Sequence, residues 1–318
     1  MNMLLYRGEK FNANFFHNSG VDIDHSFFLF STARGKALLV PEMNCEYAKS
    51  KFRSGEVISY SKQPIAEIKK FFGREGQVCL DYASIPASLF LHLKRRFSTR
   101  DISGKLTSAR AIKTPKERAL IGKAAALARR LISNVGNSPE KTDQKTSNKL
   151  LIALLKSGVS PAFSPIIASG AESSYPHSTP TAKKTQSPLL IDAGVRLRCY
   201  NSDITRCFQL SREQKMAYEK LQNIFHLLLD EIPNLQTGGE LALFARECYK
   251  RENLPYPPHS IGHGVGLDVH ERPSLSSRSK DNLKGSVFTL EPSVYFPRKF
   301  GLRYEDIAYF DGKKARIL

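Results

Sequence analysis

Short apolar runs alternate with amphipathic segments in the first third of the chain. Four runs have β character and are separated by turns rich in Gly, Pro and charged residues, at 26–31, 36–40, 56–60 and 77–82. Two further segments have the apolar spacing of helices, at 64–72 and 85–96. Strands that alternate with helices in this way predict a small α/β domain over residues 1–108.

The pattern changes near Ser103-Gly104, and longer helices follow. Thr114 can cap a helix, Pro115 suits its first position, and Glu117 completes a capping box. Apolar stripes predict four helices in the second unit, at 117–135, 143–156, 213–231 and 240–252. Strand-rich stretches follow each helix pair. The repeated order of two helices and then strands predicts an α+β domain of two related halves over residues 109–318.

The composition is that of an ordinary soluble globular protein, with 41% apolar and 25% charged residues. The apolar runs are too short to span a bilayer, and residues 1–7 do not form a secretory signal. The five cysteines include no C-x-x-C pair, which is typical of free thiols in a reducing compartment. We therefore expect a cytoplasmic protein that does not bind membranes.

The net charge of +18 is large and is shared by both parts of the chain. Residues 1–110 hold 17 Lys/Arg against 10 Asp/Glu, and the remainder holds 31 against 20. Nucleic acid can bind such a surface, but no aromatic-basic signature or known reader motif accompanies the charge. A diffusely basic, solvated surface is the favoured interpretation, and we expect no nucleic-acid partner.

A glycine-rich segment at 260–271 contains two of the chain's histidines, His263 and His270. His259 and His263 are four residues apart, a spacing that on a helix indicates a zinc-binding pair. Pro257, Pro258 and the three glycines at 262, 264 and 266 exclude a stable helix here. What remains is a curved backbone that brings imidazoles close to other groups.

Five potential metal ligands lie in strands or turns of the second unit: Asp192, Asp203, His263, Glu291 and Glu305. Carboxylates within apolar strands are costly to bury unless a positive charge neutralises them. Four carboxylates with one imidazole suit Mn²⁺, Co²⁺, Fe²⁺ or Zn²⁺. Because four negative charges exceed the need of one divalent ion, we expect two ions that activate a shared water. Taken singly, each carboxylate is better explained as a strand-end salt bridge or a turn residue.

Alternation along the strands predicts supporting partners for these ligands. Asp203 and Thr205 share a face, so the Thr205 hydroxyl can steady a ligand carboxylate. Arg303 and Glu305 share a face as well, which lets the guanidinium hold a ligand in place.

At these residues the sequence resembles the pita-bread metallopeptidases, whose fold is shared by methionine aminopeptidase, aminopeptidase P and prolidase. The matching motifs occur in the family's order, as Ile191-Asp-Ala-Gly194, Ser202-Asp-Ile-Thr-Arg206, Gly262-His-Gly-Val-Gly-Leu-Asp-Val-His-Glu271, Thr289-Leu-Glu-Pro292 and Leu302-Arg-Tyr-Glu-Asp306. The resemblance implies a pita-bread domain preceded by a creatinase-like amino-terminal domain. It also implies that Asp192 binds one metal, that His263 and Glu291 bind the other, and that Asp203 and Glu305 bridge both. Mn²⁺ is the expected metal, with Co²⁺ or Zn²⁺ as alternatives.

The same resemblance assigns roles to residues around the substrate. His177 matches the histidine beside the scissile bond, His270 one that polarises the substrate carbonyl, and His259 one that contacts the residue after the bond. As neutral imidazoles, these histidines are expected to donate hydrogen bonds to the developing oxyanion and to shuttle protons. Glu291 is the expected general base for the bridging water, and Tyr295 is expected to lie outside the ligands and support them.

The motifs are similar to those of the proline-specific branch, which implies a homodimeric exopeptidase that cleaves the bond before a proline in the second position. We expect activity like that of aminopeptidase P; prolidase, which acts on dipeptides, is the alternative. A more distant alternative is a non-catalytic module that binds nucleic acid or protein through its basic surface.

The sequence departs from the family pattern at two places. The leading strand and helix of the first domain are expected to be absent before residues 14–20, and Ser293 replaces a glycine that is common in the family.

Overall fold

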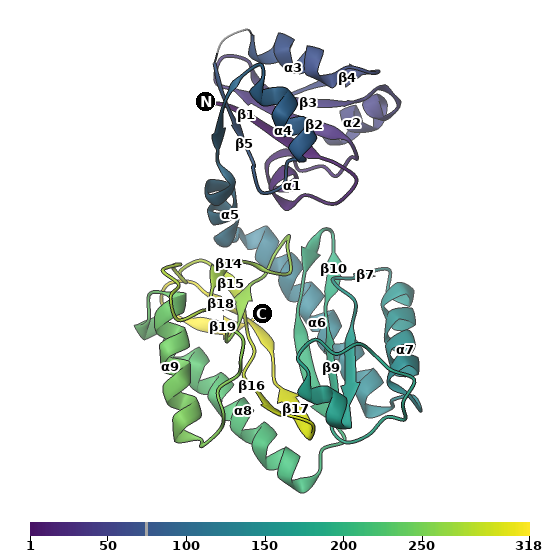
Figure 1. Ribbon diagram of the computed structural model, residues 1–318, viewed down its shortest axis with the longest axis vertical. Coiled ribbons are helices and arrows are strands. Elements are labelled where there is room, and N and C mark those ends of the chain that lie inside the picture. The colour runs from purple at the N-terminus through teal and green to yellow at the C-terminus, as the bar shows by residue number, and fades with distance from the viewer. Residues whose placement is uncertain (74–75) are drawn as a thin grey trace. The chain divides into compact units, whose positions relative to one another are not determined.

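The computed structural model describes residues 1–73 and 76–318, and the chain divides into two units, Met1–Arg110 and Ala111–Leu318 (Figure 1). Unit 1 is built on a six-stranded sheet with the strand order β4-β3-β2-β1-β5-β6. Its strands are β1 (Asn2–Arg7), β2 (Ser26–Ser31), β3 (Gly35–Pro41), β4 (Glu56–Tyr60), β5 (Gln77–Leu80) and β6 (Ser98–Asp101). Its helices are α1 (Ala13–Ser19), α2 (Cys45–Lys51), α3 (Pro64–Phe72) and α4 (Ala87–Lys94), and α5 (Ser103–Ala111) ends at the boundary.

Side chains on both faces of this sheet are buried. Neighbouring residues of β2 point to opposite faces, so Phe28 joins one apolar cluster and Phe27 and Leu29 join the other. The predicted α/β domain is therefore confirmed, including the four strands and two helices expected from the sequence. The expectation of a missing leading strand was wrong, because β1 pairs with both β2 and β5 in the middle of the sheet.

Unit 2 repeats one order of elements twice. The first half contains α6 (Pro115–Asn137), α7 (Asp143–Lys156), β7 (Ser160–Pro161), β8 (Ile166–Ser169), β9 (Leu189–Ala193), β10 (Val195–Leu197), β11 (Tyr200–Asn201) and β12 (Ile204–Phe208). The second contains α8 (Arg212–Glu231), α9 (Gly238–Arg251), β13 (His263–Gly264), β14 (Glu271–Ser274), β15 (Val287–Leu290), β16 (Ser293–Phe296), β17 (Phe300–Arg303), β18 (Asp306–Phe310) and β19 (Ala315–Ile317). The four predicted helices are confirmed, and α6 has the predicted capping box between Thr114 and Glu117.

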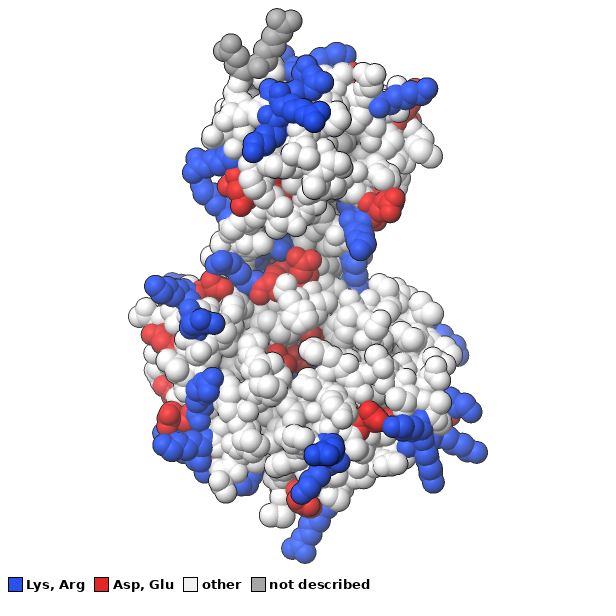
Figure 2. Space-filling view, in the orientation of Figure 1, with Lys and Arg blue, Asp and Glu red and all other residues white. Residues whose placement is uncertain are grey.

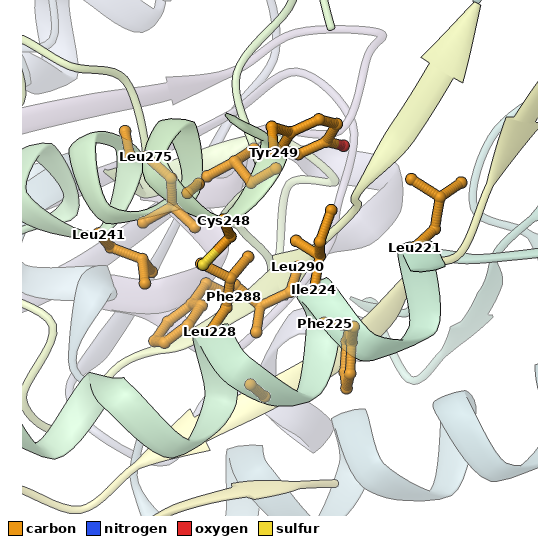
Figure 3. Close-up of a cluster of buried hydrophobic side chains, with 14 of the residues drawn as sticks. Leu221, Ile224, Phe225, Leu228, Leu241, Cys248, Tyr249, Leu275, Phe288 and Leu290 are labelled. Carbon is orange, nitrogen blue, oxygen red and sulfur yellow. The ribbon is translucent and has the colours of Figure 1, made fainter. Parts of the chain in front are cut away.

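Helices α8 and α9 bury their apolar stripes against the strands of the second half. Figure 3 shows Phe225 and Leu228 of α8 and Leu241 of α9 around Phe288 of β15. Strands β15 and β18 pair antiparallel at the centre of the five-stranded sheet β14-β13-β15-β18-β19. Burial of this apolar surface fixes the ends of β15 and β18, from which two of the predicted ligands project.

The two halves of unit 2 meet where β12 approaches the start of β18. In the sheet β12-β9-β8, Thr205 of β12 lies opposite Asp192 of β9. An isolated bridge then joins Thr205 to Glu305, and the Glu305 N–H donates to the Thr205 carbonyl at 3.2 Å. Segments about one hundred residues apart in the sequence are thereby fixed side by side. Within the described residues, no helix combines the length and the apolar character needed to cross a bilayer.

Candidate metal centre

The structure brings the five predicted ligands together at the junction of the two halves. Asp192 lies on β9, Asp203 directly precedes β12, and His263 lies on β13, while Glu291 follows β15 and Glu305 precedes β18. Asp192, Asp203 and Glu305 each offer one ligand atom within 4.8 Å of the others, and so do His263, Glu291 and Glu305. The two groups share Glu305, so its carboxylate lies beside both.

The buried oxygens of this cluster lack sufficient counter-charge from the protein. Asp192 Oδ1 and Asp203 Oδ1 are buried and have no hydrogen-bond partner among the described residues. Burial and the nearby Glu305 raise the pKa of Asp203 well above its usual value, and burial with the nearby Asp192 raises the pKa of Glu305 to about 7. Unpaired carboxylate oxygens facing one another are stabilised by divalent cations, so the residues present fit a metal centre.

Arg303 is the permanent cation in contact with this cluster. Its guanidinium donates to Asp192 through Nη2, to the Thr205 hydroxyl at 2.9 Å and to the Tyr295 hydroxyl at 3.0 Å. The Thr205 hydroxyl in turn donates to Glu305 Oε2 at 2.6 Å. Thr205 and Arg303 therefore contact the carboxylates directly, and Tyr295 is connected to them through Arg303.

His263 presents one ring nitrogen to the carboxylates. Its Nδ1 lies 3.2 Å from the Gly264 carbonyl, which can only accept, so Nδ1 carries the proton. Its Nε2 lies 3.6 Å from Asp203 Oδ2 and 4.0 Å from Glu291 Oε1. Burial, followed by the neighbouring His270, lowers the pKa of His263 to about 3, so the ring is neutral and Nε2 has a free lone pair.

The glycines beside His263 permit this placement. A Cβ on Gly262 would lie 2.0 Å from the Thr289 carbonyl oxygen of β15, and one on Gly264 would lie 2.1 Å from the Arg272 carbonyl oxygen. Only glycine lets the backbone pass so close to both neighbouring strands. The glycine-rich segment is non-helical, as predicted, and it holds His263 within a sheet.

A cavity of about 440 Å³ opens onto the cluster. His177 and His270 are exposed and line it, together with the apolar side chains of Phe163, Ile166 and Val269. The rings of His263 and His270 lie 4.1 Å apart between centroids, and His270 forms a third group of ligand atoms with Asp203 and His263. His270, expected from the sequence only at the substrate, is thus also close enough to serve as a ligand.

His259 lines the same cavity, but both of its ring nitrogens have protein partners. Nδ1 lies 2.7 Å from the Ser260 carbonyl, and Nε2 lies 3.0 Å from both Ser293 Oγ and the Tyr295 hydroxyl. This geometry differs from the expected role of His259 as a donor to substrate. Ser293 was noticed in the sequence only as a departure from a family pattern, and its contact with His259 had no sequence signal.

Sequence reasoning also missed a buried ion pair beside the cavity. Lys113 Nζ lies 2.7 Å from Glu271 Oε1, and both side chains are almost completely buried. Glu271 Oε2 accepts from the Asp268 N–H at 3.3 Å, so the pair fixes the turn that leads to His270. The signal that the sequence offered for this ion pair was the position of Glu271 directly after His270.

Acidic and basic side chains occupy different parts of the surface of unit 2. Figure 2 shows acidic side chains within a hollow of unit 2, while Lys and Arg side chains are scattered around the outer parts of this face. The visible face therefore agrees with a diffusely basic surface and shows no continuous basic groove.

Comparison with known proteins gives a consistent result. The profile described as "Metallopeptidase family M24" matches residues 119–310. An uncharacterized peptidase of Methanocaldococcus jannaschii is 34% identical over 65% of this chain and 62% of its own length, so the chain spans less than two thirds of that relative. The Xaa-Pro dipeptidase of Pyrococcus horikoshii is 30% identical over 93% of this chain and 87% of its own length.

Similarity in three dimensions extends over almost the whole chain. The crystal structure of the prolidase from Pyrococcus horikoshii OT3 superposes with a TM-score of 0.88 at 27% identity, covering 99% of this chain and 92% of that one. The pita-bread fold expected from the motifs is thereby confirmed.

Proposed function

Because the chain belongs to metallopeptidase family M24, we propose that it is a dinuclear exopeptidase that cleaves the peptide bond preceding a proline in the second position. The observation that carries this proposal is the convergence of four carboxylates and one imidazole, two of whose oxygens are buried without partners, at the base of a cavity. Asp192, Asp203, His263, Glu291 and Glu305 would hold two divalent ions, with Asp203 and Glu305 shared between them.

The bound ions would supply a water of lowered pKa and polarise the scissile carbonyl. Glu291 would accept a proton from the attacking water; burial and the nearby Glu305 raise its pKa well above the usual value, which supports this role. His177 and His270 line the cavity and can donate hydrogen bonds to the oxygen on which negative charge develops. Thr205, Arg303 and Tyr295 would keep the carboxylates in place through the hydrogen bonds that connect them.

Proline suits a dedicated enzyme because its amide nitrogen carries no hydrogen and its ring fixes φ. Aminopeptidase activity is favoured by the charges that line the cavity. Among its described lining residues, Arg303 is the one permanent cation, and its guanidinium donates to Asp192, Thr205 and Tyr295. A dipeptide places a free carboxylate directly beyond the proline, whereas a longer peptide places a neutral amide there, which this lining accommodates at lower cost.

Dipeptidase activity is the second candidate. It is favoured by the Pyrococcus horikoshii relative, which is named an Xaa-Pro dipeptidase. The deciding experiment compares an Xaa-Pro dipeptide with an Xaa-Pro-Xaa tripeptide, each with added Mn²⁺. Cleavage of the tripeptide is expected; cleavage of the dipeptide alone would replace the aminopeptidase proposal with the dipeptidase one.

The proposal includes Mn²⁺ as the metal, a homodimer and a cytoplasmic location. Oxygen-rich ligands with one nitrogen suit Mn²⁺, and they also accept Co²⁺ or Zn²⁺. Activity after reconstitution with each metal, together with the mass measured by light scattering, tests the first two points. Salt-sensitive binding to nucleic acid without peptidase activity would instead favour the non-catalytic module.

A further inference from the structure

Ser293 is held rigidly beside His259, which lines the cavity. It is completely buried at the start of β16, two residues after Glu291. Its N–H donates to the Tyr249 hydroxyl at 2.6 Å, and its carbonyl accepts from the same hydroxyl at 2.8 Å. Because Tyr249 is itself buried on α9, the backbone of Ser293 is fixed. The Ser293 hydroxyl therefore has a defined position, 3.0 Å from His259 Nε2.

The hydrogen bonds of His259 determine which ring nitrogen carries the proton. The Ser260 carbonyl, 2.7 Å from Nδ1, can only accept, so Nδ1 must donate. In a neutral imidazole Nε2 then has only a lone pair. Nε2 faces two hydroxyls, those of Ser293 and Tyr295, each at 3.0 Å. The Tyr295 hydroxyl already accepts from Arg303, so its own proton is free to be donated.

We propose that Ser293 is a positioning residue that, together with Tyr295, holds His259 with its proton on Nδ1 and both nitrogens turned to the protein. His259 then packs its carbon edge against the residue after the scissile bond and does not donate a hydrogen bond to substrate. This inference rests on the proposed function and on the family resemblance, which assigns His259 to the residue after the scissile bond; the structure shows His259 lining the cavity.

The chemistry of proline agrees with an apolar contact surface provided by His259. A proline after the scissile bond has no N–H to be bound, and its pyrrolidine ring is hydrocarbon. An imidazole whose polar atoms are satisfied elsewhere presents carbon atoms and no unpaired donor beside that ring. An alanine at the same position would bring an N–H and a smaller side chain, and His259 would contact it poorly. Ser293 is therefore expected to contribute to selectivity for proline over alanine.

The tautomer of His259 can be measured without any activity. The probe is protein labelled with ¹⁵N-histidine and loaded with Zn²⁺, which is diamagnetic, and long-range ¹H–¹⁵N correlation distinguishes the two tautomers. The signals that disappear in His259→Phe belong to His259. We expect the pattern of a ring protonated on Nδ1. A ring protonated on Nε2 would overturn the proposal, whether or not the protein cleaves Xaa-Pro peptides.

Kinetics test the contribution of Ser293 itself. Ser293→Ala is expected to raise KM for the Xaa-Pro substrate about threefold to tenfold, the range for loss of one hydrogen bond, and to lower kcat less than that. Selectivity for Xaa-Pro over Xaa-Ala should fall. Ser286→Ala is the matched control, since Ser286 is equally buried and its hydroxyl donates to the Leu283 carbonyl away from the cavity.

The control separates folding from positioning. If Ser293→Ala fails to fold, Ser293→Cys, which keeps the size of the side chain but is a weak donor, replaces it. Unchanged KM and unchanged selectivity in a folded Ser293 variant would overturn the role of Ser293, even if the wild type cleaves Xaa-Pro peptides. A wild type with no activity on any Xaa-Pro peptide would overturn the proposed function instead, and the tautomer measurement would still test His259.

Discussion

Glu305 and Asp306 are neighbours in the sequence and are equally buried, with 2% of each residue exposed, but they face opposite environments. Asp306 lies between two guanidiniums, with Arg129 Nη2 at 2.9 Å and Arg206 Nη2 at 2.5 Å. Glu305 shares its side with Asp192, Asp203 and Glu291, and its nearest cation is Arg303, whose Nε lies 3.8 Å away.

The difference shows two ways to bury a carboxylate. Around Asp306 the protein provides its own counter-charge, and the result is a structural tie between α6, β12 and β18. Around Glu305 four carboxylates share one guanidinium, so the protein alone leaves negative charge uncompensated. Added cations would neutralise charge on that side only, in agreement with the proposed metal site there and a structural role for Asp306.

The largest expected effect is on Glu305. Glu305→Gln removes a ligand charge with little change of shape, and kcat/KM for an Xaa-Pro tripeptide should fall by more than about 100-fold, the upper end of the loss caused by mutating even a residue that supports a ligand. Without metal, the same variant should be at least as stable as the wild type, because one of four repelling charges is gone. Activity within tenfold of the wild type would contradict the difference between the two sides.

Asp306→Asn makes the equivalent change one residue further along. Leaving Arg129 and Arg206 without their charged partner should lower the free energy of unfolding by about 2–3 kcal/mol, less than the roughly 3–5 kcal/mol of a fully buried pair because both arginines are partly exposed. Denaturant titration measures this loss. The folded variant should keep the wild-type metal content, and loss of metal here would show that the two sides are not independent.

A smaller effect is expected at Thr205, whose hydroxyl contacts the Glu305 side. Thr205→Val keeps the shape but removes the hydroxyl that donates to Glu305 and accepts from Arg303. Metal affinity should weaken about tenfold, the lower end of the effect of losing a partner of a ligand. Competition with a metal chelator measures the change, and Thr205→Ser, which retains the hydroxyl, should restore most of the affinity.

The smallest effect concerns the stability of the metal-free protein against pH. The folded pKa of Glu305 is raised to about 7, so its protonated form is favoured in the fold, and this contribution is lost as pH rises from the unfolded pKa through 7. His263, with a folded pKa of about 3, acts in the opposite direction, but only below its unfolded value near 6.5. Above pH 6.5, therefore, only the carboxylates of this site contribute to the change of stability with pH.

Metal-free protein should therefore lose about 1 kcal/mol of stability between pH 6.5 and 8, since one pKa unit corresponds to about 1.4 kcal/mol. Thermal unfolding at several pH values measures this slope. Glu305→Gln should have a shallower slope than the wild type, whereas Asp306→Asn should keep it. A metal-free wild type that gains stability over this range would contradict the uncompensated charge.

Much of this architecture followed from local patterns. The helices of unit 2 have long apolar stripes and explicit caps, such as Thr114 with Glu117, and they were predicted to within a few residues. Four of the five ligand candidates were recognised as carboxylates in strands or turns, and His263 was recognised in the glycine-rich segment. Strand β1 was missed because the sequence had been compared with a family pattern, and a strand at the centre of a sheet is defined by its neighbours, β2 and β5.

Side-chain partners could not be predicted from the sequence. Nothing local distinguishes Glu305 from Asp306, because the alternation of a strand says that they face opposite sides and not what lies on each side. The contact of Ser293 with His259 joins residues 34 apart in the sequence, and the Lys113–Glu271 pair is still more distant. The Lys113–Glu271 pair depends on how the two halves of unit 2 pack together, whereas the contact of Ser293 with His259 depends on the fold of the second half.

Elemental analysis of the purified protein tests the central claim most directly, with Asp203→Ala and Asp306→Asn measured beside the wild type. The account predicts two divalent ions per chain in the wild type and in Asp306→Asn, and loss of both ions in Asp203→Ala, because Asp203 is proposed to be shared by the two sites. Equal metal content in Asp203→Ala and the wild type would contradict it.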